Sequence, residues 1–403
     1  MDQDHQDHQD HQEPPQPAPG MTAPMRVAVV VLTTCCAMIA ILWVYGVYGL
    51  LMSPDYAGEG FNNDFSVFWA AARLANEGRW LAPFDVDILN AARSIPPTTE
   101  HYEMIWFYPP AYLVLLWPLG KLSFFWAWIM FCAVSLAFFA VAIRGPTRSV
   151  PGAFWFLVCA PVTMLLLTLG QNSLIFCGLL VVAVEAMRRG QPMVAGLALA
   201  LMTLKPQLGL VIPFALAAGG YWRVLVWACI FTALIVLATL VFPGLDYWTA
   251  FFRGIAAGSD RLRQPELEYL MVSAYGTLAA AGVPRDLALQ LQAVITVTTL
   301  VSLVWLWRRD VPFDVKAAGL FFSIILATPY AVYYELIFPL CGALYSARAG
   351  YGKTRPQAIL LLSIWILPVI GTVAISAQEP GYIFALVVLA ACLVVTLRRS
   401  SRA

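Results

Sequence analysis

Three ionisable side chains stand in or beside strongly apolar stretches of the sequence. Asp64 precedes FSVFWAAARLA, Lys205 lies in TLKPQLG, and Glu335 lies in TPYAVYYELIFP. A carboxylate can act as a general base toward a hydroxyl group, and a lysine ammonium can neutralise a phosphate group. An ionisable residue at the centre of a membrane helix costs about 2.5–3.5 kcal/mol on insertion scales, so such residues are functional candidates by default.

Amide and phenol groups accompany these three residues and suit the binding of sugar hydroxyls. They are Gln171, Asn172, Gln207, Tyr330, Tyr333 and Tyr334. Pro206 and Pro329 interrupt the apolar runs that carry several of them, and a proline ends or kinks a helix. Together with the three ionisable groups, they predict one polar cavity. An acid–lysine pair near a membrane also suits a proton-coupled transporter.

Each candidate also has a structural interpretation. Asp64 is placed to cap a helix, a frequent role of aspartate, and Lys205 can extend its ammonium to lipid headgroups. Gln171 and Asn172 also fit an ordinary polar turn. The pair Asp85 and Asp87 resembles a metal-binding D-x-D, but residues i and i+2 of a helix do not share a face. We therefore predict no metal site and no cofactor.

Composition defines the class of protein. Of the 403 residues, 61% are hydrophobic and only 12% are charged, whereas a soluble domain has about 25% charged residues. The mean hydropathy is +0.75. Lys and Arg number 24 against 23 Asp and Glu, so no basic surface for nucleic acid is expected. These values exclude a soluble, disordered or nucleic-acid-binding protein and predict a polytopic inner-membrane protein.

The apolar runs predict an all-α membrane protein with about twelve transmembrane helices, because a span needs about 20 residues and shorter runs tilt or stay half-buried. Residues 1–25 repeat His, Gln and Asp and then become Pro-rich, which predicts a disordered cytoplasmic tail before one membrane domain over 26–403. The predicted spans are 27–52, 122–143, 151–168, 173–187, 192–204, 207–220, 224–242, 286–307, 314–329, 332–347, 357–376 and 382–397, with re-entrant or interfacial stretches at 109–120 and 271–283.

The distribution of Lys and Arg predicts the orientation. With twelve spans, most of them fall on the side of the N-terminus, often as pairs at helix ends such as Arg188–Arg189 and Arg308–Arg309. By the positive-inside rule both termini are cytoplasmic. The long segments 53–108 and 243–270 are then outside, and the first is expected to carry short amphipathic helices whose aromatic residues lie in the interface. The predicted polar cavity opens to the outer leaflet.

The order of several short motifs resembles glycosyltransferase family 87, whose members use polyprenyl-phosphate sugars and include a mycobacterial mannosyltransferase of phosphatidylinositol mannosides. The motifs run from about Asn63 to Pro339. They are NDFSVFWAAARLANEG followed by PFD, FYPPAYLVLLWPLG, GQNSLI, LKPQLGL and TPYAVYYELIF. The resemblance implies a GT-C fold with catalysis on the outer face.

The resemblance also implies roles for residues. Asp64 matches the family's aspartate base, and Lys205 matches its K-P step, where a donor phosphate is held. Glu335 stands where an aspartate is expected in many relatives, which moves the charge by one methylene. The implied reaction moves a hexose such as mannose from a polyprenyl-phosphate sugar to a lipid or glycan acceptor, with inversion.

Two other classes of function remain as alternatives. A secondary transporter should show internal repeats and binding residues near the membrane midplane. No repeat is evident, and the polar residues cluster on one side beside a long outer segment. A non-catalytic scaffold would leave Lys205 and Glu335 without a role. The sequence therefore favours the enzyme.

Overall fold

The computed structural model describes residues 63–93, 103–261, 265–376 and 383–400. Within these ranges the regular elements are helices, with one isolated antiparallel bridge between Met271 and Val332. The predicted tail over 1–25 and the predicted span over 27–52 lie outside the described residues. The all-α prediction is confirmed for the part of the chain described.

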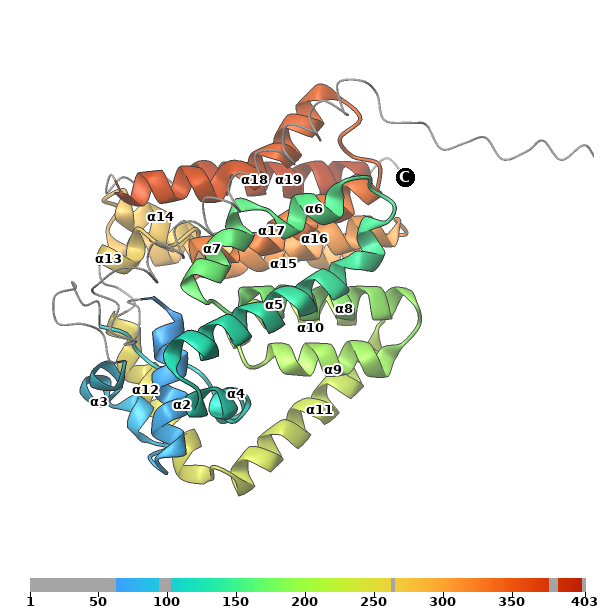
Figure 1. Ribbon diagram of the computed structural model, residues 1–403. Helices are drawn as coiled ribbons and strands as arrows, with labels where there is room; N and C mark the ends of the chain where they lie inside the picture. The colour runs from blue at the N-terminus through green and yellow to red at the C-terminus, as the bar shows by residue number, and fades with distance from the viewer. Residues whose placement is uncertain (1–62, 94–102, 262–264, 377–382, 401–403) are drawn as a thin grey trace, which may run out of the picture.

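Long helices run side by side through the molecule (Figure 1). Among the described residues, α5 (Phe124–Thr147), α11 (Trp222–Val241) and α15 (Arg285–Arg308) are long and apolar enough to cross a membrane. α8 (Ser173–Arg188) packs between α5 and α9 (Pro192–Met202), and α9 packs on α11. On the other side, α16 (Phe313–Ala327) packs on α15, on α17 (Ile337–Arg348) and on α19 (Ile383–Ser400), which contacts α18 (Arg355–Ser376). The structure thus supports a multi-helix membrane protein.

Several predicted spans are divided in the structure, and proline marks two of the divisions. The stretch 151–168 forms α6 (Ala153–Val158) and α7 (Pro161–Leu169), and 207–220 forms η3 (Pro206–Gly209) and α10 (Ile212–Ala218). Proline is tolerated in the first turn of a helix but not in its interior. The predicted interfacial stretches form α4 (Pro110–Leu116) with η2 (Trp117–Lys121), and α14 (Ala274–Ala280).

The segment after the first predicted span forms a helical cap at one end of the bundle. It contains α2 (Phe65–Asn76), η1 (Ala82–Phe84) and α3 (Val86–Ala92), and α12 (Leu245–Arg261) and α13 (Pro265–Glu268) lie at the same end (Figure 1). The aromatic side chains of α2 were expected in the membrane interface, but Phe65, Phe68 and Trp69 are buried. The expectation was wrong because η2, α4 and α5 cover this helix, and Trp69 donates to the carbonyl of Leu122.

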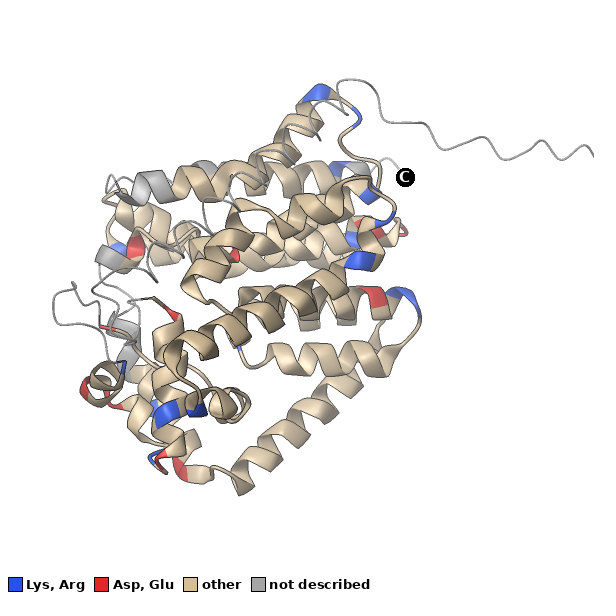
Figure 2. Cartoon of the chain, viewed as in Figure 1, with Lys and Arg blue, Asp and Glu red and all other residues tan. Residues whose placement is uncertain are grey.

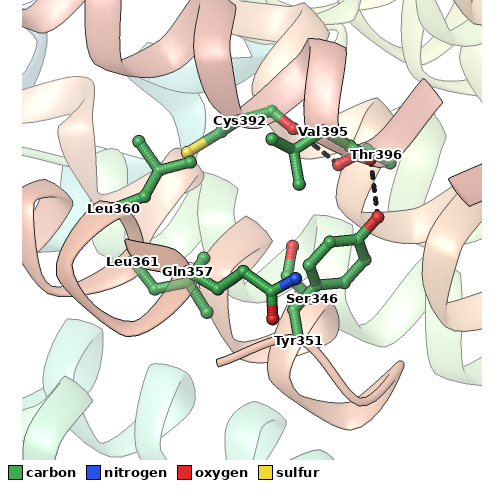
Figure 3. A pocket seen from close by; sticks show the side chains of 8 residues that line it. All are labelled: Ser346, Tyr351, Gln357, Leu360, Leu361, Cys392, Val395 and Thr396. Carbon is green, nitrogen blue, oxygen red and sulfur yellow. Dashed lines mark hydrogen bonds between the residues drawn. The ribbon is translucent and has the colours of Figure 1, made fainter. Parts of the chain in front are cut away.

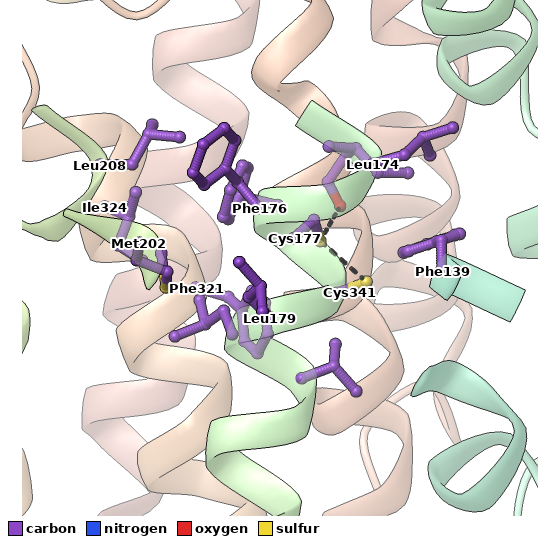
Figure 4. Close-up of a cluster of buried hydrophobic side chains, with 14 of the residues drawn as sticks. Phe139, Leu174, Phe176, Cys177, Leu179, Met202, Leu208, Phe321, Ile324 and Cys341 are labelled. Atoms are coloured by element: carbon purple, nitrogen blue, oxygen red, sulfur yellow. Dashed lines mark hydrogen bonds between the residues drawn. The ribbon is translucent and has the colours of Figure 1, made fainter. Parts of the chain in front are cut away.

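The core of the bundle is closely packed. Figure 4 shows α8 against α17, with Phe139, Leu174 and Phe176 nearby. The thiols of Cys177 and Cys341 meet here, with their sulfur atoms 3.5 Å apart. The cysteines of the described ranges are free thiols and most are buried, in keeping with a role as small apolar side chains.

Charged residues gather toward the two ends of the long helices, with few between (Figure 2). At the end opposite the cap, four residues form what we call the basal ion cluster: Glu185, Arg188, Asp314 and Arg348. Arg188 and Arg348 each contact both carboxylates, and the Tyr345 hydroxyl donates to Glu185 at 3.1 Å. The cluster ties α8, α16 and α17 together at this end.

Candidate active site

The start of α2 presents Asp64 without using it as a cap. The Asn63 side-chain oxygen accepts a hydrogen bond from the Ser66 amide at 3.2 Å, whereas the Asp64 side chain makes no capping bond. The capping role considered for Asp64 is therefore filled by its neighbour. The Asp64 carboxylate instead accepts a hydrogen bond of 2.6 Å from the Gln171 amide nitrogen.

The turn between α7 and α8 brings Gln171 to Asp64. Gly170 has a φ of +64°, which a glycine adopts readily and other residues rarely do. A β-carbon at this position would also overlap the side chain of Phe65. The missing side chain therefore lets the turn lie directly on the first residue of α2.

Asn172, the next residue of the turn, is fully buried and contacts three other side chains. Its amide nitrogen donates to the hydroxyls of Tyr108 at 3.0 Å and Tyr112 at 2.9 Å. Its amide oxygen accepts from the Lys205 ammonium at 3.3 Å. A buried amide with partners for both of its polar atoms is held in one orientation.

Lys205 has no acidic neighbour in the sequence, yet the structure pairs it with one. Its ammonium lies 2.8 Å from a Glu335 oxygen, and the two side chains are 4% and 1% exposed. The ammonium also donates to the Ser173 hydroxyl at 3.3 Å and lies 5.2 Å from the centre of the Tyr334 ring. Removal of one partner of a buried pair leaves an uncompensated charge, which costs about 3–5 kcal/mol.

The second oxygen of the Glu335 carboxylate is also held in place. Glu335 lies in η4 (Tyr333–Leu336), and its second oxygen accepts from the Val332 amide at 3.1 Å. Val332 itself is held by the bridge to Met271. One oxygen of the Glu335 carboxylate therefore contacts Lys205, and the other is held by the Val332 amide. These two contacts keep Glu335 turned toward Lys205.

The contacts form one continuous polar network, which we call the site network. It runs from Asp64 through Gln171, Asn172 and Lys205 to Glu335, with Tyr108, Tyr112, Ser173 and Tyr334 along its sides. Its members lie just before α2, in α4 and just before it, in the turn before α8 and at the first residue of α8, in the α9–η3 connection and in η4. Six of the eight site residues predicted from the sequence belong to it.

Two predicted site residues do not join the network. The Gln207 side chain is exposed, and the backbone carbonyl of this residue accepts from the Thr328 hydroxyl at 3.0 Å. Tyr330 packs edge-on against Tyr275, with ring centres 5.7 Å apart. Neighbouring side chains in a short polar segment point in different directions. Closeness in sequence to Lys205 or Glu335 therefore does not place a side chain in the site network.

The sequence interpretation missed other members. Tyr108 and Tyr112 lie in the FYPPAY motif, which was used for the family resemblance but from which no site residue was predicted; their spacing around two prolines was the available signal. Their rings stack with centres 4.4 Å apart. Tyr112 is buried, and both hydroxyls accept from Asn172, so the stacked pair holds the Asn172 amide in place.

Arg93 was also missed and is a second buried cation near Asp64. It ends α3 and is 1% exposed. Its Nε donates to the Ser66 hydroxyl at 2.8 Å, and a terminal nitrogen donates to the Asn90 side chain at 2.8 Å. Burial lowers the pKa of Arg93 to about 10, and the charge of Asp64 acts in the opposite direction.

The pKa of the Asp64 carboxyl is raised, because burial disfavours the charged form. The Gln171 hydrogen bond, and then the charges of Lys205 and Arg93, act in the opposite direction. A carboxylate with a raised pKa is a stronger base than an ordinary aspartate, which suits proton abstraction near neutral pH.

In the pair Asp85 and Asp87, the first carboxylate caps a helix. Asp85 accepts a hydrogen bond from the Ile88 amide at 3.0 Å, at the start of α3. Asp87 follows in the first turn of the same helix. Within the described ranges, no three His, Cys, Asp or Glu side chains are grouped closely enough to hold a metal ion.

Comparison with known proteins assigns the family. The family model described as glycosyltransferase family 87 matches residues 106–329, more than half of the chain. The match contains Tyr108, Gln171, Asn172 and Lys205, whereas Asp64 and Glu335 lie outside it. Searches of curated proteins and of solved structures return no match. The family match and the apolar helices together identify the chain as a membrane protein that belongs to glycosyltransferase family 87.

Proposed function

We propose that the protein transfers a hexose from a polyprenyl-phosphate sugar to a lipid or glycan acceptor, with Asp64 as general base. One observation carries this proposal. Asp64 is half-buried and caps nothing, and it is joined through Gln171 and Asn172 to a lysine, so a base and a cation belong to one hydrogen-bonded network. This arrangement supports proton removal from an acceptor at one end and charge neutralisation at the other.

The proposed reaction is a single displacement. The acceptor hydroxyl gives its proton to Asp64 as its oxygen attacks the anomeric carbon of the donor. The bond from that carbon to the phosphate oxygen breaks, and polyprenyl phosphate leaves with the bonding electrons. One attack on the face opposite the leaving group inverts the anomeric configuration, and no covalent enzyme intermediate is needed.

Lys205 is proposed to contact the donor phosphate. Its three donor positions are occupied by Glu335 at 2.8 Å and by Asn172 and Ser173 at 3.3 Å. The two longer bonds are to neutral groups, and hydrogen bonds between charged groups are the stronger ones. A phosphate oxygen can therefore replace Asn172 or Ser173 while the ion pair with Glu335 is kept.

The proposed location is the outer face of the inner membrane, with both termini cytoplasmic and about twelve spans in a GT-C-like bundle. Gln171 and Asn172 lie just before the first residue of α8, whereas Glu185 and Arg188 of the basal ion cluster lie in its last turn. A 16-residue helix is about 24 Å long at 1.5 Å per residue. The network and the basal cluster are thus separated by most of the bilayer's apolar thickness, which supports a site near the outer surface.

The test is transfer by the Asp64→Asn variant. Purified protein in lipid nanodiscs is incubated with a radiolabelled polyprenyl-phosphate hexose and a membrane lipid extract. Because an amide cannot accept the acceptor's proton, transfer should fall by about 10²-fold or more, while donor binding is retained. Asp85→Asn serves as the matched control and should transfer normally, since asparagine caps a helix as well as aspartate does.

Two results would contradict the proposal. Near-normal transfer by a well-folded Asp64→Asn variant would remove the base assignment. Uptake of free sugar into vesicles by the wild-type protein, with no transfer to any acceptor, would favour a secondary transporter in place of the enzyme.

A further inference from the structure

A cavity at the basal end of the bundle is separate from the site network. Its volume is about 190 Å³, and α5, α8 and the start of α9 form its walls. A second cavity, between α17, α18 and α19, is only about 10 Å³ (Figure 3). One water molecule needs about 10–15 Å³, so the smaller cavity has room for one water at most, whereas the larger one accommodates a substantial part of a small molecule.

The lining of the larger cavity changes along its length. On α5 the lining residues run from Phe138 and Val141 to Gly145, and on α8 they run from Val182 to Arg189 just beyond its end. Seven residues of helix span about 10 Å. The deeper part of the cavity is therefore apolar, and its outer part, at the helix ends, is polar.

Arg189 carries a charge that no described residue neutralises. Its neighbours Arg188 and Arg348 are paired with Glu185 and Asp314, but no ion pair or side-chain hydrogen bond is found for Arg189 among the described residues. Its guanidinium reaches across to α5, where it would lie 3.5 Å from a β-carbon on Gly145. The start of α9, with Gln191 before its first residue, adds the partial positive charge of a helix N-terminus.

Glu185 also lines this cavity, and its charge is compensated. Its carboxylate lies 3.4 Å from Arg188 and 3.9 Å from Arg348, and it accepts the Tyr345 hydrogen bond. With two carboxylates and two guanidinium groups the basal ion cluster is neutral. Arg189 therefore leaves a net positive charge at the mouth of the cavity.

We infer that this cavity binds an anionic phospholipid of the adjacent leaflet, with its phosphate on Arg189 and Gln191 and part of an acyl chain between α5, α8 and α9. The rim faces the bilayer, since Val141 is 73% and Val194 is 46% exposed. A free phosphate would match the charge but not the apolar depth, and a zwitterionic lipid would match the depth but not the charge. In the proposed orientation the leaflet is the inner one. The inference does not depend on the transfer chemistry.

The test uses the full-length protein in phosphatidylcholine nanodiscs that contain a small fraction of phosphatidylglycerol with a photoreactive group in its acyl chain. Cross-links should map to Phe138–Ala142 on α5 and Val182–Ala186 on α8. The same probe on phosphatidylcholine should label these segments less. Arg189→Gln should lower the phosphatidylglycerol signal about fivefold, given the attraction typical of one cation near an anionic membrane surface. Arg308→Gln, an exposed cation at the end of α15, is the matched control and should change nothing.

A second variant tests the apolar part of the cavity. Ala142→Phe should fill the space and reduce cross-linking from either lipid, and size-exclusion chromatography shows whether the variant is folded. If Ala142→Phe is unstable, Arg189→Gln still decides, because an exposed side chain is not needed for folding. Equal labelling by the two lipids, or unchanged labelling in Arg189→Gln, would overturn the inference. Loss of labelling on addition of glycerol 3-phosphate would replace it with a site for a soluble anion.

Discussion

At the scale of single residues, the hydrogen bond between Gln171 and Asp64 decides how the proposed base behaves. Burial raises the pKa of Asp64, and this bond is the largest effect that opposes the rise. An aspartate accepts protons from the acceptor only while it is ionised. Activity that depends on the ionised form is therefore present above the raised pKa and is lost as the pH falls through it.

Replacement of Gln171 with leucine should move the acid limb of the pH–rate profile to higher pH. The variant loses the donor that stabilises the carboxylate, so the pKa of Asp64 rises further and a higher pH is needed to ionise it. Transfer at low pH should fall more than transfer at high pH. The measurement is kcat/KM against pH. Gln207→Leu, which removes an exposed amide outside the network, should leave the profile unchanged; an unchanged profile in Gln171→Leu as well would show that this bond does not control the base.

At the scale of elements, local patterns predicted which segments are helical but not what covers them. The apolar run after Asp64 predicted α2, and Pro206 predicted the break at η3, whereas the break at Pro161 before α7 was not predicted. The burial of α2 depends on η2 and α5, more than 40 residues later in the chain. The pairing of Lys205 with Glu335 joins residues 130 positions apart. No local pattern contains such contacts, so the sequence predicted that both residues line one polar cavity but not that they form an ion pair.

A substitution in η2 should disturb α2 and with it the site network. Gly120 lies so close to α2 that a β-carbon would overlap the backbone of Ala72 and Arg73. Backbone atoms cannot rotate aside as a side chain can, so Gly120→Ala should lower stability by about 1–3 kcal/mol, as overpacking typically does. Because α2 carries Asp64, transfer should fall as well. Thermal unfolding in detergent measures the first effect. Gly209→Ala, with no atom within 4 Å of the added carbon, is the control, and equal stability of the two variants would contradict the close contact.

At the scale of the whole molecule, composition was informative because it depends on no particular contact. The low charge and high hydropathy predicted the membrane class, and the arginine pairs at helix ends predicted the basal end. The number of spans was harder to predict, since several apolar runs form short or divided helices in the structure. The composition of a run indicates that it is buried, but both lipid and neighbouring helices can bury it.

The proposed orientation predicts which ends of the molecule are reached from outside the cell. Asp87 is exposed on α3 in the cap, and Asp310 is exposed between α15 and α16 at the basal end. In a background with the exposed Cys229 replaced by serine, a membrane-impermeant maleimide should label Asp87→Cys in intact spheroplasts. It should label Asp310→Cys only after permeabilisation, because the bilayer separates that residue from the reagent. A cytoplasmic marker protein that stays unlabelled shows that the spheroplasts are sealed. Labelling of Asp310→Cys before permeabilisation, with Asp87→Cys protected, would reverse the orientation and place the site network at the cytoplasmic face, where the donor and acceptor would have to be supplied from inside the cell.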